Sequence, residues 1–281
     1  MAQFTNQAQL RFNDTVIESN VAVGEIREAL TVSKTAVVDE YTREDTLTYV
    51  VSIRNTADTA VSGVTVTDNL GADTAPFPLS YVEGSLLVYE NGELQTEAPV
   101  VVAGPPLVVS GLTVPAGGSL LLIYQAEVTP FASPEVGGTI TNTATVTGQG
   151  VTTPVTAEET VTAQEAFDLT ITKSIEPVPV TENGRLTYTL TIRNWGNRPV
   201  VATDDVIVTD TFDPILSDLV VTFNGQLWEE GVQYEYAQST GAFSTNPGRI
   251  TVPAATFTED PVTGRWTVTP GEVTLVITGT V

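Results

Sequence analysis

The chain of 281 residues contains no cysteine and no histidine. Without cysteine, no disulfide can cross-link the fold. Without histidine, the commonest general base, zinc ligand and near-neutral pH switch are all absent. These two absences exclude enzymes that use a Ser-His-Asp or Cys-His nucleophile. The sequence also has no nucleotide-binding glycine loop and no metal-ligand cluster, so we expect neither an enzyme nor a cofactor.

Basic residues are scarce as well. The chain has 11 Lys and Arg against 34 Asp and Glu, a formal net charge of −23. Such a surface repels phosphate backbones and anionic lipid heads, so nucleic acids and membrane surfaces are poor partners. No apolar run reaches the roughly 18 residues of a membrane span. The opening "MAQFTNQAQL" lacks the basic and apolar regions of a secretory signal, so we expect either a signal that has been removed or export without one.

Alternation of polar and apolar residues is what the chain has in abundance. Segments such as "TLTYVVSI" and "RLTYTLTI" alternate with a period of two, which is typical of half-buried β-strands. Clusters of Gly, Pro, Asn and Asp separate these segments, and no stretch has a sustained helical period. The length suffices for two domains with cores of their own. The sequence therefore predicts an all-β protein of two tandem immunoglobulin-like β-sandwiches.

An internal repeat indicates two copies of one domain. Four segments match in order: 30–38 with 169–177, 46–55 with 185–194, 64–70 with 206–212, and 114–128 with 268–281. The first copy continues through 139–164, which predicts one or two further strands, and the second copy has nothing comparable. We expect a donor-strand extension and linker at 1–29, a complete first sandwich at 30–163, and a second sandwich at 164–281 that lacks its last strand.

The missing strand has a match at the start of the chain. Residues 4–26 resemble 140–161, so that Asn6 aligns with Asn142, and Asn13-Asp14 takes the place of a glycine-containing turn. We therefore interpret the opening segment as the final strand of a sandwich whose body lies elsewhere. Two destinations remain open, which are the second sandwich of the same chain and that of the next molecule.

The length of the connection bears on this choice. The link from about Val21 to Leu30 spans at most about 30 to 36 Å, so closure within one chain is strained unless the two domains lie side by side. Insertion into a neighbour is a head-to-tail contact, and such contacts generate open filaments. An added strand would satisfy an unpaired sheet edge and fill an uncovered core groove.

The only two lysines of the chain occupy equivalent positions of the repeat. Lys34 and Lys173 lie on the first predicted strand of each sandwich, and the other nine basic residues are arginines. Each repeat also ends a matched strand with an aspartate, Asp68 in "VTVTDNL" and Asp210 in "VIVTDTF". A lysine kept only for solubility would not recur at one position in both copies, although either aspartate alone is explained as a turn residue.

Asparagine completes a set of three groups. Asn142 supplies it in the first sandwich, and Asn6 would supply it in the second. Lys, Asp and Asn are the groups needed for a spontaneous isopeptide bond. Burial lowers the pKa of a lysine, so a neutral amine can exist, and a buried carboxyl group can hold a proton and polarise the asparagine carbonyl. The amine attacks that carbonyl and ammonia leaves, with contact between the groups supplying most of the acceleration.

The pattern "KT…YVVSIRNTADTAVSGVTVTDNLG…ITNTATV" resembles the bacterial surface repeat called domain of unknown function eleven. The resemblance covers both sandwiches and the opening strand, and it implies stalk-like immunoglobulin-type modules of surface and secreted proteins. Related adhesin and pilin modules of Gram-positive bacteria carry internal Lys–Asn isopeptide bonds with an acidic helper, which implies these roles for Lys34, Asn142 and Asp68. The second sandwich departs from the family because it lacks its own Asn strand. No sortase motif is present.

These observations favour a structural subunit of an extracellular bacterial fibre, which joins copies of itself head to tail by donor-strand complementation and by isopeptide bonds within and between subunits. The lack of a signal resembles spore-surface appendage subunits, so we expect a cell or spore surface. The alternative is a monomeric adhesin or stalk module, in which the opening strand folds back and loops bind a host or surface ligand. Its candidate loop aromatics are Trp195, Trp228 and Trp266, for which packing at a core or rim is the simpler explanation.

Overall fold

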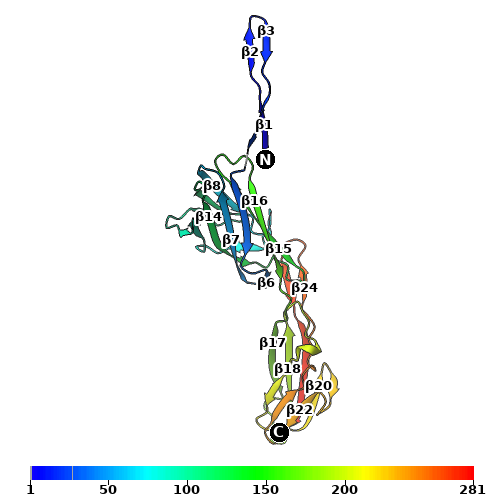
Figure 1. Cartoon of the computed structure of the whole chain (residues 1–281). Helices are drawn as coiled ribbons and strands as arrows, with labels where there is room; N and C mark the ends of the chain where they lie inside the picture. Colours follow the sequence, from blue (N-terminus) through cyan, green and yellow to red (C-terminus); the bar gives the residue numbers. More distant parts are fainter. Residues whose placement is uncertain (1, 27) are drawn as a thin grey trace. The chain divides into compact units, whose positions relative to one another are not determined.

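The computed structural model describes residues 2–26 and 28–281, coloured along the chain in Figure 1. Contacts divide the chain into two compact units. The first comprises Met1–Thr129 and Ile140–Val161, and the second comprises Pro130–Thr139 and Thr162–Val281. Nearly all regular structure in the described residues is β-strand, with one short 3-10 helix. The predicted all-β class is confirmed.

The N-terminal segment forms an extended hairpin. It consists of β1 (Ala2–Asn6), β2 (Gln9–Phe12), β3 (Thr15–Glu18) and β4 (Ala22–Ile26). Strand β1 pairs with β4, and β2 pairs with β3 across the predicted turn at Asn13-Asp14, which is confirmed. Residues predicted to be a link therefore belong to a strand, because 22–26 pair with 2–6. We call residues 2–26 the donor hairpin, after the role predicted for them from the sequence; a hairpin of four short strands, rather than a single strand, precedes the first sandwich.

The first sandwich contains two sheets. One has the strand order β11-β10-β14-β7-β5, with β9 also paired to β14, and the other has the order β12-β13-β8-β15-β16-β6. The strands are β5 (Leu30–Ala36), β6 (Glu40–Tyr41), β7 (Thr46–Asn55), β8 (Val61–Asp68), β9 (Leu79–Tyr81), β10 (Leu87–Glu90), β11 (Glu93–Leu94), β12 (Val100–Val102), β13 (Leu107–Val114), β14 (Ser119–Val128), β15 (Thr139–Thr147) and β16 (Val155–Ala163). The predicted extra strands of this repeat are thus β15 and β16.

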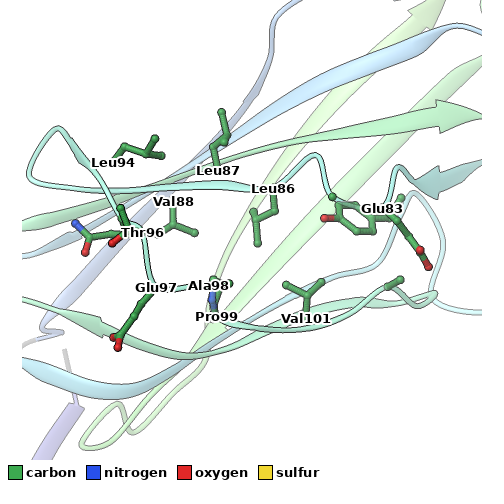
Figure 2. Close-up of a pocket in the computed structure, with 14 residues that line it drawn as sticks. Glu83, Leu86, Leu87, Val88, Leu94, Thr96, Glu97, Ala98, Pro99 and Val101 are labelled. Carbon is green, nitrogen blue, oxygen red and sulfur yellow. The ribbon is translucent and has the colours of Figure 1, made fainter.

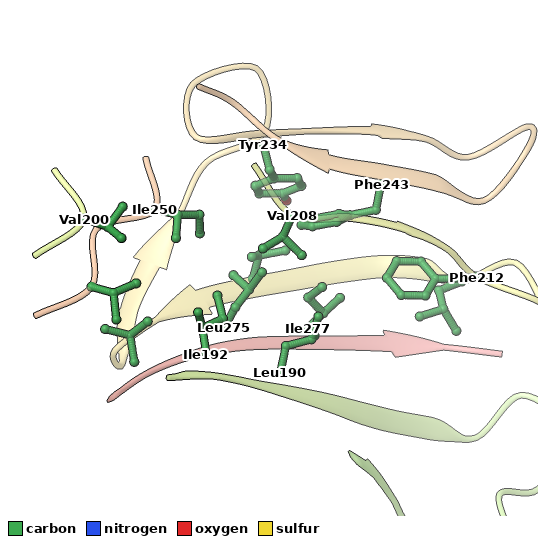
Figure 3. Close-up of a cluster of buried hydrophobic side chains, with 14 of the residues drawn as sticks. Leu190, Ile192, Val200, Val208, Phe212, Tyr234, Phe243, Ile250, Leu275 and Ile277 are labelled. Carbon is green, nitrogen blue, oxygen red and sulfur yellow. The ribbon is translucent and has the colours of Figure 1, made fainter. Parts of the chain in front are cut away.

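The second sandwich repeats part of this arrangement. Its sheets have the orders β17-β18-β26-β20-β21 and β19-β23-β22, beside a separate β24-β25 hairpin. The elements are β17 (Leu169–Glu176), β18 (Arg185–Asn194), η1 (Ala202–Asp204), β19 (Thr209–Thr211), β20 (Ser217–Phe223), β21 (Gln226–Trp228), β22 (Tyr234–Ala237), β23 (Ala242–Thr245), β24 (Thr256–Glu259), β25 (Trp266–Thr269) and β26 (Gly271–Thr280). Figure 3 shows part of its core, where Leu190, Ile192, Leu275 and Ile277 project from neighbouring strands toward Phe243.

Period-two patterning explains why these strands form sandwiches. Along β7 and β14, every second side chain is buried and the residues between them are more exposed. The two strands pair over nine residues, with Tyr49 opposite Tyr124. In the second sandwich, β18 and β26 pair in the same way, with Tyr188 opposite Ile277. The shared register makes Ile277 the counterpart of Tyr124.

Candidate functional site

The three predicted groups of the first sandwich meet in its core. Lys34 lies on β5, Asp68 ends β8, and Asn142 lies on β15, so three strands from both sheets converge. All three side chains are buried. Lys34 Nζ forms an ion pair with Asp68 Oδ2, and Asp68 Oδ1 accepts a hydrogen bond of 3.1 Å from the backbone N–H of Leu70. A complete Lys–Asp–Asn set is therefore enclosed in one hydrophobic core.

A tyrosine hydroxyl joins these groups. Tyr124 on β14 donates a hydrogen bond to Asp68 Oδ2. Its oxygen accepts a hydrogen bond of 3.0 Å from Lys34 Nζ and one of 3.3 Å from Asn142 Nδ2. The Tyr124 ring stacks on that of Tyr49 with centroids 5.8 Å apart. The carbonyl oxygen Oδ1 of Asn142 is buried and makes no hydrogen bond within the described residues.

Burial controls the charge of the cluster. Removal of Lys34 from water lowers the pKa of its amine to about 8, against the opposing attraction of Asp68 and of Glu159. Desolvation, followed by the negative charge of Asp68, raises the pKa of Tyr124, so its hydroxyl stays protonated at neutral pH. A neutral, nucleophilic lysine amine is thus accessible close to pH 7, which an exposed lysine does not offer.

Two tyrosines and a glutamate were absent from the sequence prediction. Alternation along β7 and β14 points Tyr49 and Tyr124 inward, but the repeat gives no support for Tyr124, because its counterpart is Ile277. The Thr141 and Thr160 hydroxyls lie 2.8 Å apart, and Ala163 N donates to Gly138 O at 2.7 Å. This register places the half-buried Glu159 opposite Asn142 on the same face of the sheet.

The corresponding groups of the second sandwich are open to solvent. Lys173 Nζ pairs with Asp210 Oδ2, but these side chains are 38 % and 17 % exposed, against 0 % and 1 % for Lys34 and Asp68. The Lys173 amine lies over the ring of Tyr188, 4.1 Å from its centroid, and 5.4 Å from that of Phe212. The structure thus brings together two of the three predicted groups on this sandwich.

The greater exposure of Lys173 and Asp210 follows from the strands that lie beside β8 and β19, the strands that carry the two aspartates. In the first sandwich, β8 lies between β13 and β15. In the second, β19 pairs with β23 and is the terminal strand of its sheet. Strand β17 is exposed or half-buried along its whole length, whereas β5 buries Leu30 and Lys34. Among residues 2–26 and 28–281, nothing pairs with this edge of β19 or covers β17, where the first sandwich has β15 and β16.

The third predicted group, Asn6, lies on the donor hairpin. It ends β1 opposite Ala22 and is exposed. Large apolar side chains of the hairpin are exposed with it, including Phe4 at 53 % and Leu10 at 62 %. Their counterparts on β15, Ile140 and Val146, are buried at 1 % and 0 % exposure. The hairpin thus has large apolar residues at the positions that are buried in β15, but in the hairpin these residues are exposed to solvent.

The three tryptophans pack within the second unit. Trp228 stacks on Phe223 with ring centroids 5.0 Å apart, and Trp195 Nε1 donates a hydrogen bond of 3.1 Å to Thr170. Trp266, at the start of β25, is half-buried and donates its backbone N–H to Pro130 O at 2.9 Å. Rim packing accounts for these contacts.

A pocket of about 580 Å³ lies instead in the first sandwich, among β9 to β12 and their loops. Figure 2 shows Leu86, Val88 and Val101 in its lining, with Glu83 and Glu97 at opposite sides. Across 2–26 and 28–281, no group of three or more Asp or Glu side chains is arranged to hold a metal ion. No helix in this part of the chain is long and apolar enough to cross a membrane.

No protein-family model and no curated protein matches the chain. The resemblance to domain of unknown function eleven therefore stays a prediction. Among solved structures, the D312A variant of the major pilin subunit of Bacillus cereus has a TM-score of 0.39 and 12 % identity, over 96 % of this chain and 73 % of the pilin.

The pilus backbone protein of Streptococcus pneumoniae has a TM-score of 0.35 and 11 % identity, over 86 % of this chain. The chain spans 55 % of the length of that protein. The collagen-binding domain of a Staphylococcus aureus adhesin has a TM-score of 0.33 and 13 % identity, over 49 % of this chain and 99 % of that domain. The chain is thus distantly similar in structure to pilin backbone subunits and to surface adhesin domains.

Proposed function

We propose that the chain is a structural subunit of an extracellular bacterial fibre, in which the donor hairpin of one subunit completes the second sandwich of the next. The observation that carries this proposal is the unpaired edge of β19 beside the exposed Lys173, at the place where the first sandwich has β15 and Asn142. The donor hairpin resembles β15 and β16 in sequence and, like them, is an antiparallel hairpin. Donor and acceptor lie on one chain, so the contact is head-to-tail and generates a filament.

The first sandwich supplies the register of the junction. Ala144 on β15 pairs with Asp68 on β8. With Ala8 aligned to Ala144, the donor hairpin pairs Ala8 with Asp210 of the next subunit. Asn6 then enters the site of Lys173, as Asn142 lies in one cluster with Lys34, where both bind the Tyr124 hydroxyl. Phe4, Ala8 and Leu10 follow the same inward period of two and fill the groove.

Hydrophobic burial supplies the driving force for this junction. Phe4 and Leu10 are more than half exposed on the hairpin, and Ile171 and Ile175 on β17 are 53 % and 42 % exposed. Full burial of one such side chain stabilises by about 1.5–3 kcal/mol. Main-chain hydrogen bonds along β19 add to this, because an unpaired edge strand gains a partner.

The short connection after the hairpin favours a neighbouring molecule over the same chain. Strand β4 ends at Ile26 and β5 begins at Leu30. Ala22 lies at most about 28 Å from Leu30 along the chain, and Asn6 lies opposite Ala22, about 5 Å away on the paired strand, so Asn6 is held within about 33 Å of Leu30. Ten-residue strands of the first sandwich are themselves about 33 Å long, so the hairpin has little reach past that sandwich.

Covalent bonds would then lock each subunit and each junction. In the first sandwich, the Lys34 amine attacks the Asn142 carbonyl carbon, an amide forms, and the side-chain nitrogen leaves as ammonia. Lys173 and Asn6 undergo the same reaction between subunits. A closed loop of about 100 residues, such as that from Lys34 to Asn142, stabilises a fold by about 5 kcal/mol in the chain-entropy description of cross-links.

The chemistry of the junction supports a second copy of the chain as the partner, and we propose the cell or spore surface as the location. Because the reacting groups are the side chains of the chain itself, assembly requires no cofactor. The acidic surface, with a formal charge of −23, disfavours nucleic acid and anionic lipid.

Denaturing electrophoresis tests the proposal. Purified protein that has formed fibres, boiled in detergent, should give a ladder of covalent multimers. Lys173→Arg and Asn6→Ala should abolish the ladder while fibres remain visible by electron microscopy. Lys34→Arg is the matched control, because it removes the internal bond and should leave the ladder. Fibres without a ladder in the unmodified protein would rule out the intermolecular bond.

A monomeric adhesin is the second candidate, favoured by the pocket between β9 and β12 with its apolar lining. In that case the donor hairpin closes its own second sandwich. The same electrophoresis then gives only a monomer band. The molecular mass of this monomer is lower by two ammonia units, one for each bond. A hairpin deletion of residues 2–26 separates the two candidates further, since it abolishes fibres only if the hairpin joins different subunits.

A further inference from the structure

The hydroxyl of Tyr124 forms hydrogen bonds with all three groups of the cluster, Asp68, Lys34 and Asn142. It donates to Asp68 Oδ2 and accepts from Lys34 Nζ at 3.0 Å and from Asn142 Nδ2 at 3.3 Å. It is therefore in contact with the acid, the nucleophile and the nitrogen that must depart. The ring is buried on β14, so bulk water does not replace it easily.

Departure of an amide nitrogen requires a proton. An amide anion is far too basic to leave, so Nδ2 must become ammonia as its bond to the carbonyl carbon breaks. Asp68 can receive a proton from the Lys34 ammonium through their direct ion pair. From the same oxygen, Oδ2, the hydrogen bond of Tyr124 leads to Asn142 Nδ2.

We propose that Tyr124 is a catalytic residue that relays a proton from Asp68 to the leaving nitrogen of Asn142. This inference rests on the isopeptide bond proposed above. Tyr124 gives its own proton to Nδ2 and takes one from Asp68 in the same step.

The step balances in atoms and charge. The Lys34 ammonium first gives one proton to Asp68, which frees the amine. The amine attacks the Asn142 carbonyl carbon, the relay delivers that proton to Nδ2, and ammonia leaves. The attacking nitrogen loses its second proton to Asp68. Lysine ammonium, aspartate and asparagine amide thus become the new amide, ammonia and aspartic acid, and Tyr124 is unchanged.

The electrostatics suit a relay rather than a reservoir of protons. Burial and the charge of Asp68 raise the pKa of Tyr124, so the hydroxyl is not left ionised. A protonated tyrosine can assist the reaction only by giving its proton to Asn142 Nδ2 while it takes another from Asp68. Positioned proton transfer of this kind accelerates reactions by about 10²–10⁴-fold.

The second sandwich provides a natural comparison. Ile277 stands opposite Tyr188 where Tyr124 stands opposite Tyr49. The junction site therefore has a lysine, an aspartate and an incoming asparagine, but no hydroxyl from this strand. We expect the bond between subunits to form more slowly than the bond inside the first sandwich.

The test follows the mass of the full-length chain over time after cell-free synthesis. Tyr124→Phe keeps the ring and should slow the loss of the first ammonia by about 100-fold. Tyr81→Phe removes a hydroxyl from another ring that packs against Tyr124, with centroids 6.3 Å apart, and should leave the rate nearly unchanged. Resistance to proteolysis establishes that both variants are folded.

Three results would overturn the relay. If Tyr124→Phe loses ammonia as fast as the unmodified chain, the bond stands and the relay is wrong. If both tyrosine variants are slowed equally, buried polarity rather than proton transfer explains the effect. If the unmodified chain never loses ammonia, the bond and the relay fall together. Should Tyr124→Phe not fold, Ile277→Tyr decides, because it should accelerate bonding between subunits, and an unchanged rate would refute the relay.

Discussion

Substitution of one inward-facing donor residue should weaken the fibre without affecting the subunit. Leu10 is 62 % exposed on the donor hairpin, and its counterpart Val146 is fully buried. Docking thus removes about three fifths of a leucine side chain from water, and full burial of leucine is worth about 1.5–3 kcal/mol. Leu10→Ala should therefore cost about 1.5 kcal/mol per junction, before any penalty for the cavity left behind.

This energy predicts a measurable shift in assembly. Each 1.4 kcal/mol changes an association constant about tenfold, so the critical concentration for fibre formation should rise at least about tenfold. The measurement is light scattering or sedimentation against protein concentration, in a Lys173→Arg background that keeps assembly reversible. The melting temperature of the free subunit should not change, because Leu10 is not part of either hydrophobic core there.

A matched control on the same hairpin makes the test specific. Val16 is 48 % exposed and lies opposite Arg11, on the face away from Leu10 and Ile17. Val16→Ala should leave the critical concentration within about twofold. An equal effect of the two substitutions, or none from Leu10→Ala, would refute the proposed orientation of the hairpin in the groove.

Three other predictions concern the bonds and the register. Lys34→Arg should retain the ammonia that the unmodified chain loses from the first sandwich, in addition to the mass change of the substitution itself, and should lower the free energy of unfolding of that sandwich by about 5 kcal/mol, measured by mass spectrometry and urea unfolding; a mass difference equal to the substitution alone would show that no bond forms there. In Asn142→Ala, which leaves Lys34 unbonded, the folded pKa of about 8 lies below the unfolded value of 10.5. The unfolded chain then binds more protons, so stability should rise by about 2 kcal/mol from pH 8 to pH 9.5, and a flat profile would contradict the buried neutral amine. Gln9→Cys and Thr209→Cys chains, mixed after separate purification, should form a mixed disulfide, because Thr145 pairs with Thr67 in the first sandwich; cross-linking of either chain with itself instead would place the hairpin in another register.

The repeat made much of the candidate site predictable. Lys34, Asp68 and Asn142 could be selected because two of them recur in the second copy and the third recurs at the start of the chain. Their burial in one cluster follows from the period of two, which places alternate residues inside. The position that the repeat does not share, Tyr124, was missed for the same reason, since comparison with Ile277 discards it.

The two-stranded form of the donor hairpin could not be predicted from propensity. The segment "AVGEI" contains Gly24, and glycine inside a strand weakens a strand prediction. The structure supplies the reason for it, because a Cβ at this position would collide with the Phe4 ring on the paired strand. Only the pairing of residues 2–6 with 22–26 identifies this glycine as a site of close approach.

Gly24 and its partner Phe4 divide side-chain volume differently from the corresponding pair on β15 and β16. The register that pairs Thr141 with Thr160 places Ile140 opposite Val161, and both are buried. In the donor hairpin, Phe4 and Gly24 occupy these two positions. One large and one absent side chain replace two of medium size, so the pair keeps a similar volume, which is the kind of core change that proteins tolerate best.

The residue opposite the asparagine also differs between β15–β16 and the donor hairpin, and here the difference is in polarity rather than in size. Glu159 stands there in the first sandwich, whereas Ala22 stands opposite Asn6 in the donor hairpin. Together with Ile277 in place of Tyr124, this leaves the proposed junction site without two polar groups of the internal site. The internal bond would then form during folding, and the junction bond only after docking. A slow second bond has a physical consequence, because a hairpin that docks out of register can dissociate before it is locked in place.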